Sequence, residues 1–315
     1  MTRSMNSPDA NSIAMAILTA HLPRFGAHPP VVPQHYASDD PVYRGVRQAA
    51  ALMGFIEADA ECLARAWQAQ SRRLGLFEAQ RWPATPVDFD LREFPPQARD
   101  DAFAPCPAQL GLYAVLPDAA WVGRMARAGV PTVQLRFKSG DARAVQAEVR
   151  AAVAAVQGTP ALLFINDHWQ AAIEAGAYGV HLGQEDLDAL TESDVDAIRR
   201  AGLRLGVSTH GYAEMQRADA VSPSYLALGA VFPTTLKLMA TAPQGLTRLK
   251  CYAQLMRGYP LVAIGGFDVS RVPAAMAAGV GSVAVVRAIV GADDPEAAAR
   301  ALMDAIAQHP PAAGR

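Results

Sequence analysis

From Gly111 to the C-terminal region, short apolar runs rich in β-branched residues alternate with longer Ala-rich stretches. A parallel sheet whose strands are joined by crossover helices requires this alternation. The runs that we expect to form strands are Gly111–Leu116, Thr132–Phe137, Ala161–Asn166, Gly179–Leu182, Arg204–Ser208, Tyr225–Val231, Leu261–Ile264 and Ser282–Val286. This is the number of strands that closes a (β/α)₈ barrel. An open doubly wound sheet is the rival, and the unbroken alternation favours the barrel.

Helical patterns fill the intervals between these runs, and most of them end near a glycine, as helices often do. We expect helices over Ala142–Val156, His168–Ala175, Val195–Ala201, Leu246–Arg257, Val269–Ala278 and Pro295–Ala307. The sequence therefore predicts an α/β fold, a TIM barrel over residues 108–315.

The first 107 residues follow another pattern. Pro-rich passages at Pro23–Pro33 and Arg81–Pro107 flank one strongly helical stretch, Tyr43–Leu76, which we expect to form a helical hairpin. Its apolar positions could cover a barrel face or a neighbouring subunit. The stretch contains no P-loop and no GxGxxG motif. We therefore expect residues 1–107 to be a mainly helical extension of unknown function. Deletion of this extension should spare catalysis if it only packs or regulates.

Composition and charge narrow the classes of partner. The chain has 315 residues, of which 51% are hydrophobic and 18% are charged, so it can bury a sizeable core and is not wholly disordered. A formal net charge of −2 gives no global attraction to nucleic acid or to an anionic membrane. Any polyanion must be held by a local cluster of cations. We expect small-molecule partners, and a homo-oligomer is possible.

Cysteine spacing and hydropathy suggest a compartment. Cys62, Cys106 and Cys251 lie far apart without CxxC spacing, so the sequence indicates neither a zinc site nor a disulfide framework, and a reducing cytoplasm fits. The segment Ser12–Leu22 is apolar for about ten residues, which is too short to span a bilayer. A signal-peptide core of that length is possible, but only Arg3 supplies the basic charge before it.

The second expected strand carries charged side chains on one face. Period-two alternation puts Gln134, Arg136 and Lys138 together and leaves apolar residues on the other face. If the apolar face packs under helices, the polar face points into the mouth of the barrel, where barrel active sites lie and where buried charges need a ligand. An Arg fork beside a mobile Lys suits a diphosphate. The alternative is a solvated strand end whose charges point into water.

Two carboxylates follow the next two strands. Asp167 comes after the third strand and Asp186 after the fourth. Hard oxygen ligands of this kind suit Mg²⁺, which accepts one or two carboxylates together with waters and substrate phosphates. Asp186 alone would as readily be a helix N-cap. His181 is a lone histidine in an apolar strand, and we expect it to be a hydrogen-bonded core residue rather than a metal ligand.

Later strand ends offer further donors to anions. Gly206–His210 supplies hydroxyls that either cap a helix or bind a phosphate oxygen. The segment Gly229–Gly245 lacks a helical pattern, as mobile lids do, and Lys237 could swing onto a phosphate when it closes. Ile264–Gly266 and Val285–Arg287 lie where barrels bind phosphate through backbone N–H groups. Two separate anion sites imply two phosphorylated substrates.

Taken in order, these motifs resemble those of the thiamine phosphate synthase family over about residues 112–307. They are Gln134-Leu-Arg-Phe-Lys138, Asn166-Asp167, His181-Leu-Gly-Gln-Glu-Asp186, Gly206-Val-Ser208, Phe232-Pro-Thr-Thr-Leu-Lys237 and Ala263-Ile-Gly-Gly266. The resemblance implies a Mg²⁺-dependent transferase that joins hydroxymethylpyrimidine diphosphate to hydroxyethylthiazole phosphate. It also implies that diphosphate departs first and that the thiazole nitrogen attacks a pyrimidine methyl cation.

The same resemblance implies roles for individual residues. Asp167 and Asp186 would hold Mg²⁺, and Gln134 would meet the pyrimidine. The diphosphate would be held by Arg136, Lys138, Asn166, Ser208 and Lys237, with Arg136, Lys138 and Lys237 as the catalytic groups. The thiazole phosphate would be surrounded by Thr234, Thr235, Gly266, Val286 and Arg287, and the expected binding segments also include Leu135, Phe137 and Leu236.

Three positions depart from the family pattern. Leu236 stands where the family usually has a Thr, and Arg287 stands where it usually has a Ser. Phe137 replaces a residue that is often acidic, but its expected outward direction gives this little consequence. Two other functions stay open. One is a thiazole tautomerase with the same barrel, which does not need the diphosphate site. The other is a non-catalytic barrel that binds thiamine phosphates or a partner.

Overall fold

The computed structural model describes residues 9–26, 35–92, 94, 96–234 and 242–311. The chain forms two compact units. One, called here the extension unit, comprises Met1–Glu93 and Gly211–Arg217, and the other, the barrel unit, comprises Phe94–His210 and Ala218–Arg315. The sequence-based division after residue 107 thus differs from the division into units, which falls at residue 93 and assigns one short later segment to the extension unit.

Residues 94–107 belong to the barrel unit because polar contacts fasten them there. Arg99 forms a buried ion pair with Asp219 at 2.9 Å, and the Tyr259 hydroxyl donates to the same carboxylate at 2.6 Å. The Phe103 N–H donates to the carbonyl of Ser222. Removal of either partner of a buried ion pair leaves an uncompensated charge. A deletion up to residue 107 therefore removes part of the barrel unit as well as the extension.

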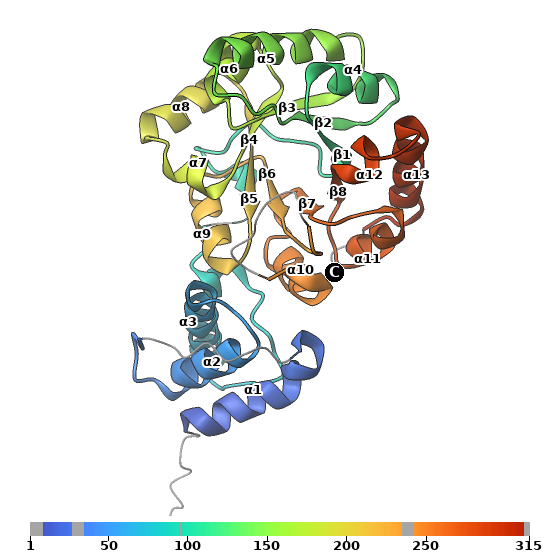
Figure 1. Cartoon of the computed structure of the whole chain (residues 1–315). Coiled ribbons are helices and arrows are strands. Elements are labelled where there is room, and N and C mark those ends of the chain that lie inside the picture. Colours follow the sequence, from blue (N-terminus) through green and yellow to red (C-terminus); the bar gives the residue numbers. More distant parts are fainter. Residues whose placement is uncertain (1–8, 27–34, 93, 95, 235–241, 312–315) are drawn as a thin grey trace, which may run out of the picture. The chain divides into compact units, whose positions relative to one another are not determined.

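The barrel unit contains the predicted closed barrel of eight parallel strands, in which each strand pairs with its neighbours in the sequence and β8 pairs with β1 (Figure 1). The strands are β1 Gly111–Leu116, β2 Thr132–Leu135, β3 Leu162–Asn166, β4 Gly179–Leu182, β5 Arg204–Thr209, β6 Tyr225–Leu228, β7 Leu261–Ile264 and β8 Ser282–Val285. All eight expected strands are confirmed. β2 and β6 end two and three residues earlier than expected, which affects where the following side chains point.

Helices ring the barrel (Figure 1). They are α4 Ala119–Arg127, α5 Ala142–Val156, α6 Trp169–Ala175, α7 Gln184–Asp188, α8 Glu192–Arg200, α9 Tyr212–Ala220, α10 Gly245–Leu255, η3 Val269–Arg271, α11 Val272–Ala277, α12 Arg287–Val290 and α13 Pro295–Gln308. The short 3₁₀ helix η2 Pro96–Ala98 precedes them in the barrel unit. The six expected helices are present, and the sequence analysis did not identify α4, α7, α9 and α12. Within the described residues, no helix is both long and apolar enough to cross a membrane.

Aromatic side chains fill the interior of the barrel. Tyr113, Phe164 and Tyr225 are at most 2% exposed and pack together in the core cluster. Gly206 makes room for one of them, because a methyl group at this position would lie 2.1 Å from Cζ of Tyr225. The small residue on β5 and the large one on β6 thus fill complementary space, as barrel interiors require.

The extension unit contains the expected helical hairpin, formed by α2 Pro41–Leu52 and α3 Glu57–Leu74, together with α1 Ala10–Phe25 and the 3₁₀ helix η1 Pro86–Phe89. Asp40 caps α2 by accepting the N–H of Val42 at 2.8 Å, as N-caps do. The apolar segment noted near the N-terminus is part of α1, whose buried residues include Ile13 and Ile17. Trp67 and Trp82 meet edge to face at 5.3 Å and anchor an aromatic core.

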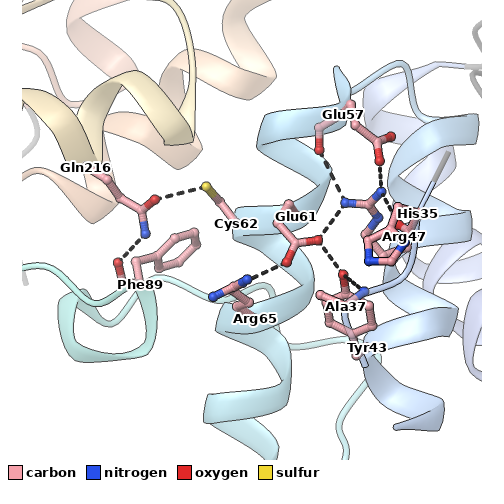
Figure 2. A network of polar contacts seen from close by, with 10 residues as sticks. All are labelled: His35, Ala37, Tyr43, Arg47, Glu57, Glu61, Cys62, Arg65, Phe89 and Gln216. Carbon is pink, nitrogen blue, oxygen red and sulfur yellow. Dashed lines mark hydrogen bonds and ion pairs between the residues drawn. The ribbon is translucent and has the colours of Figure 1, made fainter. Parts of the chain in front are cut away.

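A polar network ties the hairpin together (Figure 2). Arg47 is only 2% exposed and pairs with Glu57 and with Glu61, the latter at 2.7 Å. The Tyr43 hydroxyl also donates to Glu61, and Arg65 donates to it at 2.7 Å. A guanidinium that is buried to this extent is stable only when carboxylates and carbonyls satisfy it.

The fit between Gly206 and Tyr225 gives a stability prediction. Gly206→Ala should lower the free energy of unfolding by about 1–3 kcal/mol, because the added methyl forces a fully buried ring to move. Urea unfolding of the purified chain measures the change. Gly140→Ala is the matched control, since a methyl there meets nothing within 4 Å. Equal stability of the two variants would contradict the packing argument.

Candidate active site

A cavity of about 490 Å³ opens at the carboxyl ends of the barrel strands. All eight strands, or the residues directly after them, contribute to its walls. This is the end at which barrels carry active sites, and the size suits small-molecule substrates. The floor is aromatic and apolar, with Tyr113 and Tyr225 among its residues, whereas the rim carries acidic, basic and hydroxyl groups.

One side of the rim holds two acidic side chains, Asp167 and Asp186, and a third, Asp268, lines the cavity after β7. Burial, followed by the nearby Asp186 carboxylate, raises the pKa of Asp167 to about 6. Asp167 also has a left-handed backbone, with φ of 64°. Such conformations in a non-glycine residue are uncommon and often occur at functional sites.

Asp186 also accepts the N–H of Gly183 at 3.3 Å, at the start of α7. Asp186 therefore contacts the start of α7 and also lines the cavity, so the two interpretations of this residue do not exclude each other. No group of three or more His, Cys, Asp or Glu side chains suited to a metal occurs within the described ranges. The two carboxylates are nevertheless a donor set that fits Mg²⁺, which needs only one or two of them. A cation between two like charges also removes their mutual repulsion.

The cations are less concentrated than the strand pattern predicts. Arg136 lines the cavity, and its positive charge lowers the pKa of Asp167 against the larger effect of burial. Lys138 does not line it. Lys138 is exposed and lies with Phe137 at an adjacent hollow, to which Asp167 and His168 also contribute. The period-two prediction of an inward side chain holds for Arg136 and is wrong for Lys138, because β2 ends at Leu135.

The end of β5 is held from two sides by amide side chains. Ser208 lines the cavity, and its carbonyl accepts a hydrogen bond from Gln184 Nε2 at 2.7 Å. Gln244 Nε2 donates to the carbonyl of His210 at 2.7 Å and to that of Gly229 at 2.6 Å. Because both glutamines are buried, these bonds fix the backbone from which Ser208 projects.

A chain of hydrogen bonds crosses the floor of the cavity. Gln134 Nε2 donates to the Tyr113 hydroxyl at 3.0 Å, and the hydroxyls of Tyr113 and Tyr225 lie 2.7 Å apart. The Tyr225 hydroxyl is 2.7 Å from His181 Nδ1, and His181 Nε2 is 2.8 Å from Ser208 Oγ. The chain therefore joins β2, β1, β6, β4 and β5.

The direction of this chain follows from its first donor. With the Gln134 amide donating to Tyr113, each tyrosine hydroxyl donates onward, and His181 Nδ1 accepts. His181 then carries its proton on Nε2 and donates to Ser208, whose own hydroxyl proton points elsewhere. Burial, aided by Arg136, lowers the pKa of His181 to about 4, which keeps the ring neutral.

The opposite side of the cavity is built from glycines and arginines. Gly265 and Gly266 follow β7 with φ of 101° and 70°, a region that favours glycine. Gly266, Val286 and Arg287 line the cavity, together with Arg271. The Arg271 guanidinium donates to the Gly266 carbonyl. The guanidinium thus lies beside the glycine turn at which the sequence predicts the binding of a phosphate.

The structure brings most of the predicted site residues to one cavity. These are Gln134, Arg136, Asn166, Asp167, Asp186, Ser208, Thr234, Gly266, Val286 and Arg287. Phe137 and Lys138 lie at the adjacent hollow, and Leu135 is a buried strand residue that does not line either space. Thr235, Leu236 and Lys237 lie outside the described residues.

The sequence analysis did not name several of the lining residues as site residues, among them Tyr113, Tyr225, His181 and Arg271. Tyr113 and Tyr225 lie on apolar strands, and nothing in their local pattern distinguishes an inward from an outward tyrosine. His181 was expected to be a hydrogen-bonded core residue, and it is buried and hydrogen-bonded but also faces the cavity. Arg271 carried one available signal, its position shortly after the Gly265–Gly266 pair.

Comparisons with known proteins find similar sequences and a similar fold. A family model described as thiamine monophosphate synthase matches residues 112–289. Thiamine-phosphate synthase of Neisseria meningitidis serogroup B is 54% identical over 199 residues, which are 63% of this chain and 96% of that protein. Thiamine-phosphate synthase of Cronobacter sakazakii is 52% identical over 202 residues, 64% of this chain and 95% of that protein.

A solved structure is also similar. It is a thiamine phosphate pyrophosphorylase from Pyrococcus furiosus, with a TM-score of 0.55 and 26% sequence identity. The similarity covers 63% of this chain and 96% of that one. The matched family region begins at residue 112, so it lies entirely after the first 107 residues that were set apart as an extension.

The floor of the cavity yields a prediction about a proton. At pH 7, nitrogen-15 NMR of the histidine rings should find His181 neutral with its proton on Nε2, because Nδ1 accepts from Tyr225. Tyr225→Phe removes that donor, so the tautomer preference should weaken and the free energy of unfolding should fall by about 1–3 kcal/mol. Tyr178→Phe, which alters a half-buried ring at the edge of the same cluster, is the control. A proton found on Nδ1 of His181 in the unmodified protein would contradict the assigned direction of donation along these hydrogen bonds.

Proposed function

The chain belongs to the thiamine monophosphate synthase family, and on that premise we propose that it makes thiamine phosphate from hydroxymethylpyrimidine diphosphate and hydroxyethylthiazole phosphate. The observation that carries the proposal is the meeting of Asp167, Asp186 and Arg136 at the rim of one barrel cavity. Acidic and basic groups so close together suit a ligand that carries both a metal ion and several negative charges.

The diphosphate end is assigned to the side of the cavity with the carboxylates. Asp167 and Asp186 would hold Mg²⁺, which when bound neutralises negative charge on the leaving diphosphate. Arg136 can bind two phosphate oxygens in a fork. Asn166 and Ser208 lie on the same rim and offer neutral donors. Ser208 is suited to donate because His181 occupies its acceptor side.

Lys138 and Lys237 complete this assignment. Lys138 lies beside Asp167 in the adjacent hollow, and its four-carbon side chain can reach the rim as a mobile point charge. Lys237 is assigned from the family motif. Both groups compensate the negative charge of the departing diphosphate. In a dissociative substitution, departure of the leaving group is the step that determines the rate.

The thiazole phosphate is assigned to the other side of the cavity. Gly266 and Val286 offer backbone N–H groups at strand ends, and Arg287 and Arg271 offer positive charge. Thr234 also lines this space. Thr235 and Leu236 are assigned from the family motif. Because Leu236 has no hydroxyl, Thr235 would donate the hydroxyl contact to the thiazole phosphate. Arg287 would replace the hydroxyl that the family usually has with a charged contact.

The chemistry then requires little beyond binding and electrostatics. After diphosphate departs, the pyrimidine methyl carbon carries positive charge and the thiazole nitrogen attacks it. The apolar floor around Val115, Ala227 and Val262 limits water, which would compete for that carbon. Gln134, held by Tyr113, can orient the pyrimidine ring. A protein nucleophile is unnecessary.

Retention of the diphosphate side separates this function from its alternatives. A thiazole tautomerase has no use for Arg136, Asp167 and Asp186 converging at one rim. A non-catalytic binder has no use for carboxylates that lie close enough to repel each other.

The cysteines are free thiols, two of them buried, and we place the reaction in the reducing cytoplasm on that ground.

Diphosphate release tests the function directly. The full-length chain, mixed with both substrates and Mg²⁺, should release diphosphate and form thiamine phosphate in equal amounts, and EDTA should abolish both. Asp167→Asn should require at least about tenfold more Mg²⁺ for half-maximal rate, because it removes one of two charged ligands. The reaction with only the thiazole substrate is the control. Formation of an isomerised thiazole without diphosphate release would favour the tautomerase.

The Arg136 side chain gives a second test of the same site. Arg136→Ala should lower turnover at least about a hundredfold, since stabilisation of a leaving group's charge is typically worth several kcal/mol. Arg143→Ala is the matched control, because Arg143 is exposed near the start of α5 and does not line the cavity. Steady-state rates of diphosphate release measure both. Unchanged turnover in Arg136→Ala would remove that residue from the site.

A further inference from the structure

The beginning of α9 belongs to the extension unit and follows directly in the chain on residues that line the cavity. Gly211–Arg217 belongs to the extension unit. Ser208, Thr209 and His210 immediately precede this segment in the chain, and all three line the cavity. The segment Ser208–His210 is held at its start by β5 and by the hydrogen bonds from Gln184 and Gln244 to the Ser208 and His210 carbonyls. At its end, the path of its backbone depends on how Gly211 is held.

Asp59, on α3, supplies the cap that α9 lacks in its own sequence. The Met215 N–H bonds to the Gly211 carbonyl, so Gly211 is the capping position, and a glycine has no side chain to accept the early N–H groups. The Asp59 carboxylate accepts the N–H of Ala213 at 3.0 Å instead. A carboxylate at this end of a helix is also favoured by the helix dipole.

The identity of Gly211 follows from the same contact. A methyl group at residue 211 would lie 2.0 Å from Asp59 Oδ2 and 2.6 Å from its Cγ. Asp59 is only 4% exposed, so its side chain has little space into which to move. Glycine here allows the carboxylate to approach the backbone closely, as in other helix-start anion contacts.

Further contacts hold the following turns of α9 within the extension unit. Trp82 Nε1 donates to the Tyr212 hydroxyl at 3.0 Å, and the Tyr212 ring stacks on Phe89 at 4.9 Å. Gln216 Nε2 donates to the Phe89 carbonyl at 2.6 Å, and the Cys62 thiol donates to Gln216 Oε1 at 3.0 Å (Figure 2). The segment is thus an integrated part of the extension unit's own core.

We infer that Asp59 is a positioning residue for the Ser208–His210 segment, and that the extension unit thereby sets the affinity for the diphosphate substrate. This inference rests on the proposed function, because it assigns Ser208 to the diphosphate. Asp59 acts through Gly211 and the start of α9 and touches no substrate.

Steady-state kinetics of three variants test the inference. Asp59→Ala removes the acceptor for the Ala213 N–H, and the KM for the pyrimidine diphosphate should rise about tenfold while the KM for the thiazole phosphate changes less than about twofold. Asp59→Asn keeps an oxygen acceptor and should restore most of the affinity. Glu61→Ala disturbs the Arg47 network of the same helix without touching α9 and should leave both KM values unchanged.

Gly211→Ala provides a second route to the same contact if Asp59→Ala proves insoluble. The methyl clashes with Asp59, so this variant should also raise the KM for the diphosphate substrate, whereas adding it to Asp59→Ala should add little. A purely structural role would lower the active fraction and leave both KM values unchanged in all variants, which would overturn the inference. An inactive unmodified chain would instead refute the proposed function.

Discussion

The proximity of two carboxylates at the barrel mouth is the constraint to which the rest of the site responds. Burial and the nearby Asp186 carboxylate together raise the pKa of Asp167. Such an arrangement is unfavourable for an empty protein and favourable once a divalent cation is present. Arg136, which directly follows β2, offsets these effects only in part, because the pKa of Asp167 stays raised. This is the physical basis for the proposal that the diphosphate substrate binds here together with Mg²⁺.

A polar chain inside an apolar barrel imposes a second constraint. Buried hydroxyls, amides and imidazoles must all be satisfied, and the chain from Gln134 to Ser208 achieves this with one direction of donation. Because Gln134 is assigned to the pyrimidine and Ser208 to the diphosphate, the two ends of one substrate would meet the two ends of one network. Gly206 permits this by leaving space for the Tyr225 ring.

The sequence predicts the barrel well because the signal is repeated. Each strand is a short apolar run with a helical pattern after it, and an error at one strand end does not disturb the count. Residues at strand ends, such as Asn166 and Asp167 at the end of β3, line the cavity as the sequence predicts. The predicted inward direction was wrong for Lys138, because period-two alternation was extended past Leu135, where β2 ends.

Residues inside the barrel were harder to predict, since Tyr113 and Tyr225 differ from outward-facing tyrosines only in the register of the closed sheet. The contact between Asp59 and the start of α9 leaves no local pattern at all. An acidic residue in the first turn of α3 is expected to stabilise α3 itself, yet Asp59 also caps a helix far along the chain.

That contact also changes what the extension can be. A segment that only packed or regulated could be removed without altering the barrel, as the pattern of the sequence suggests. Gly211–Arg217, however, completes the core of the extension unit and at the same time continues the chain from His210 at the cavity. Loss of residues 1–93 would leave Tyr212 without Trp82 and Phe89 and would leave the Ala213 N–H without its carboxylate. The helix that begins there, directly after the cavity-lining residue His210, would lose the carboxylate that caps it.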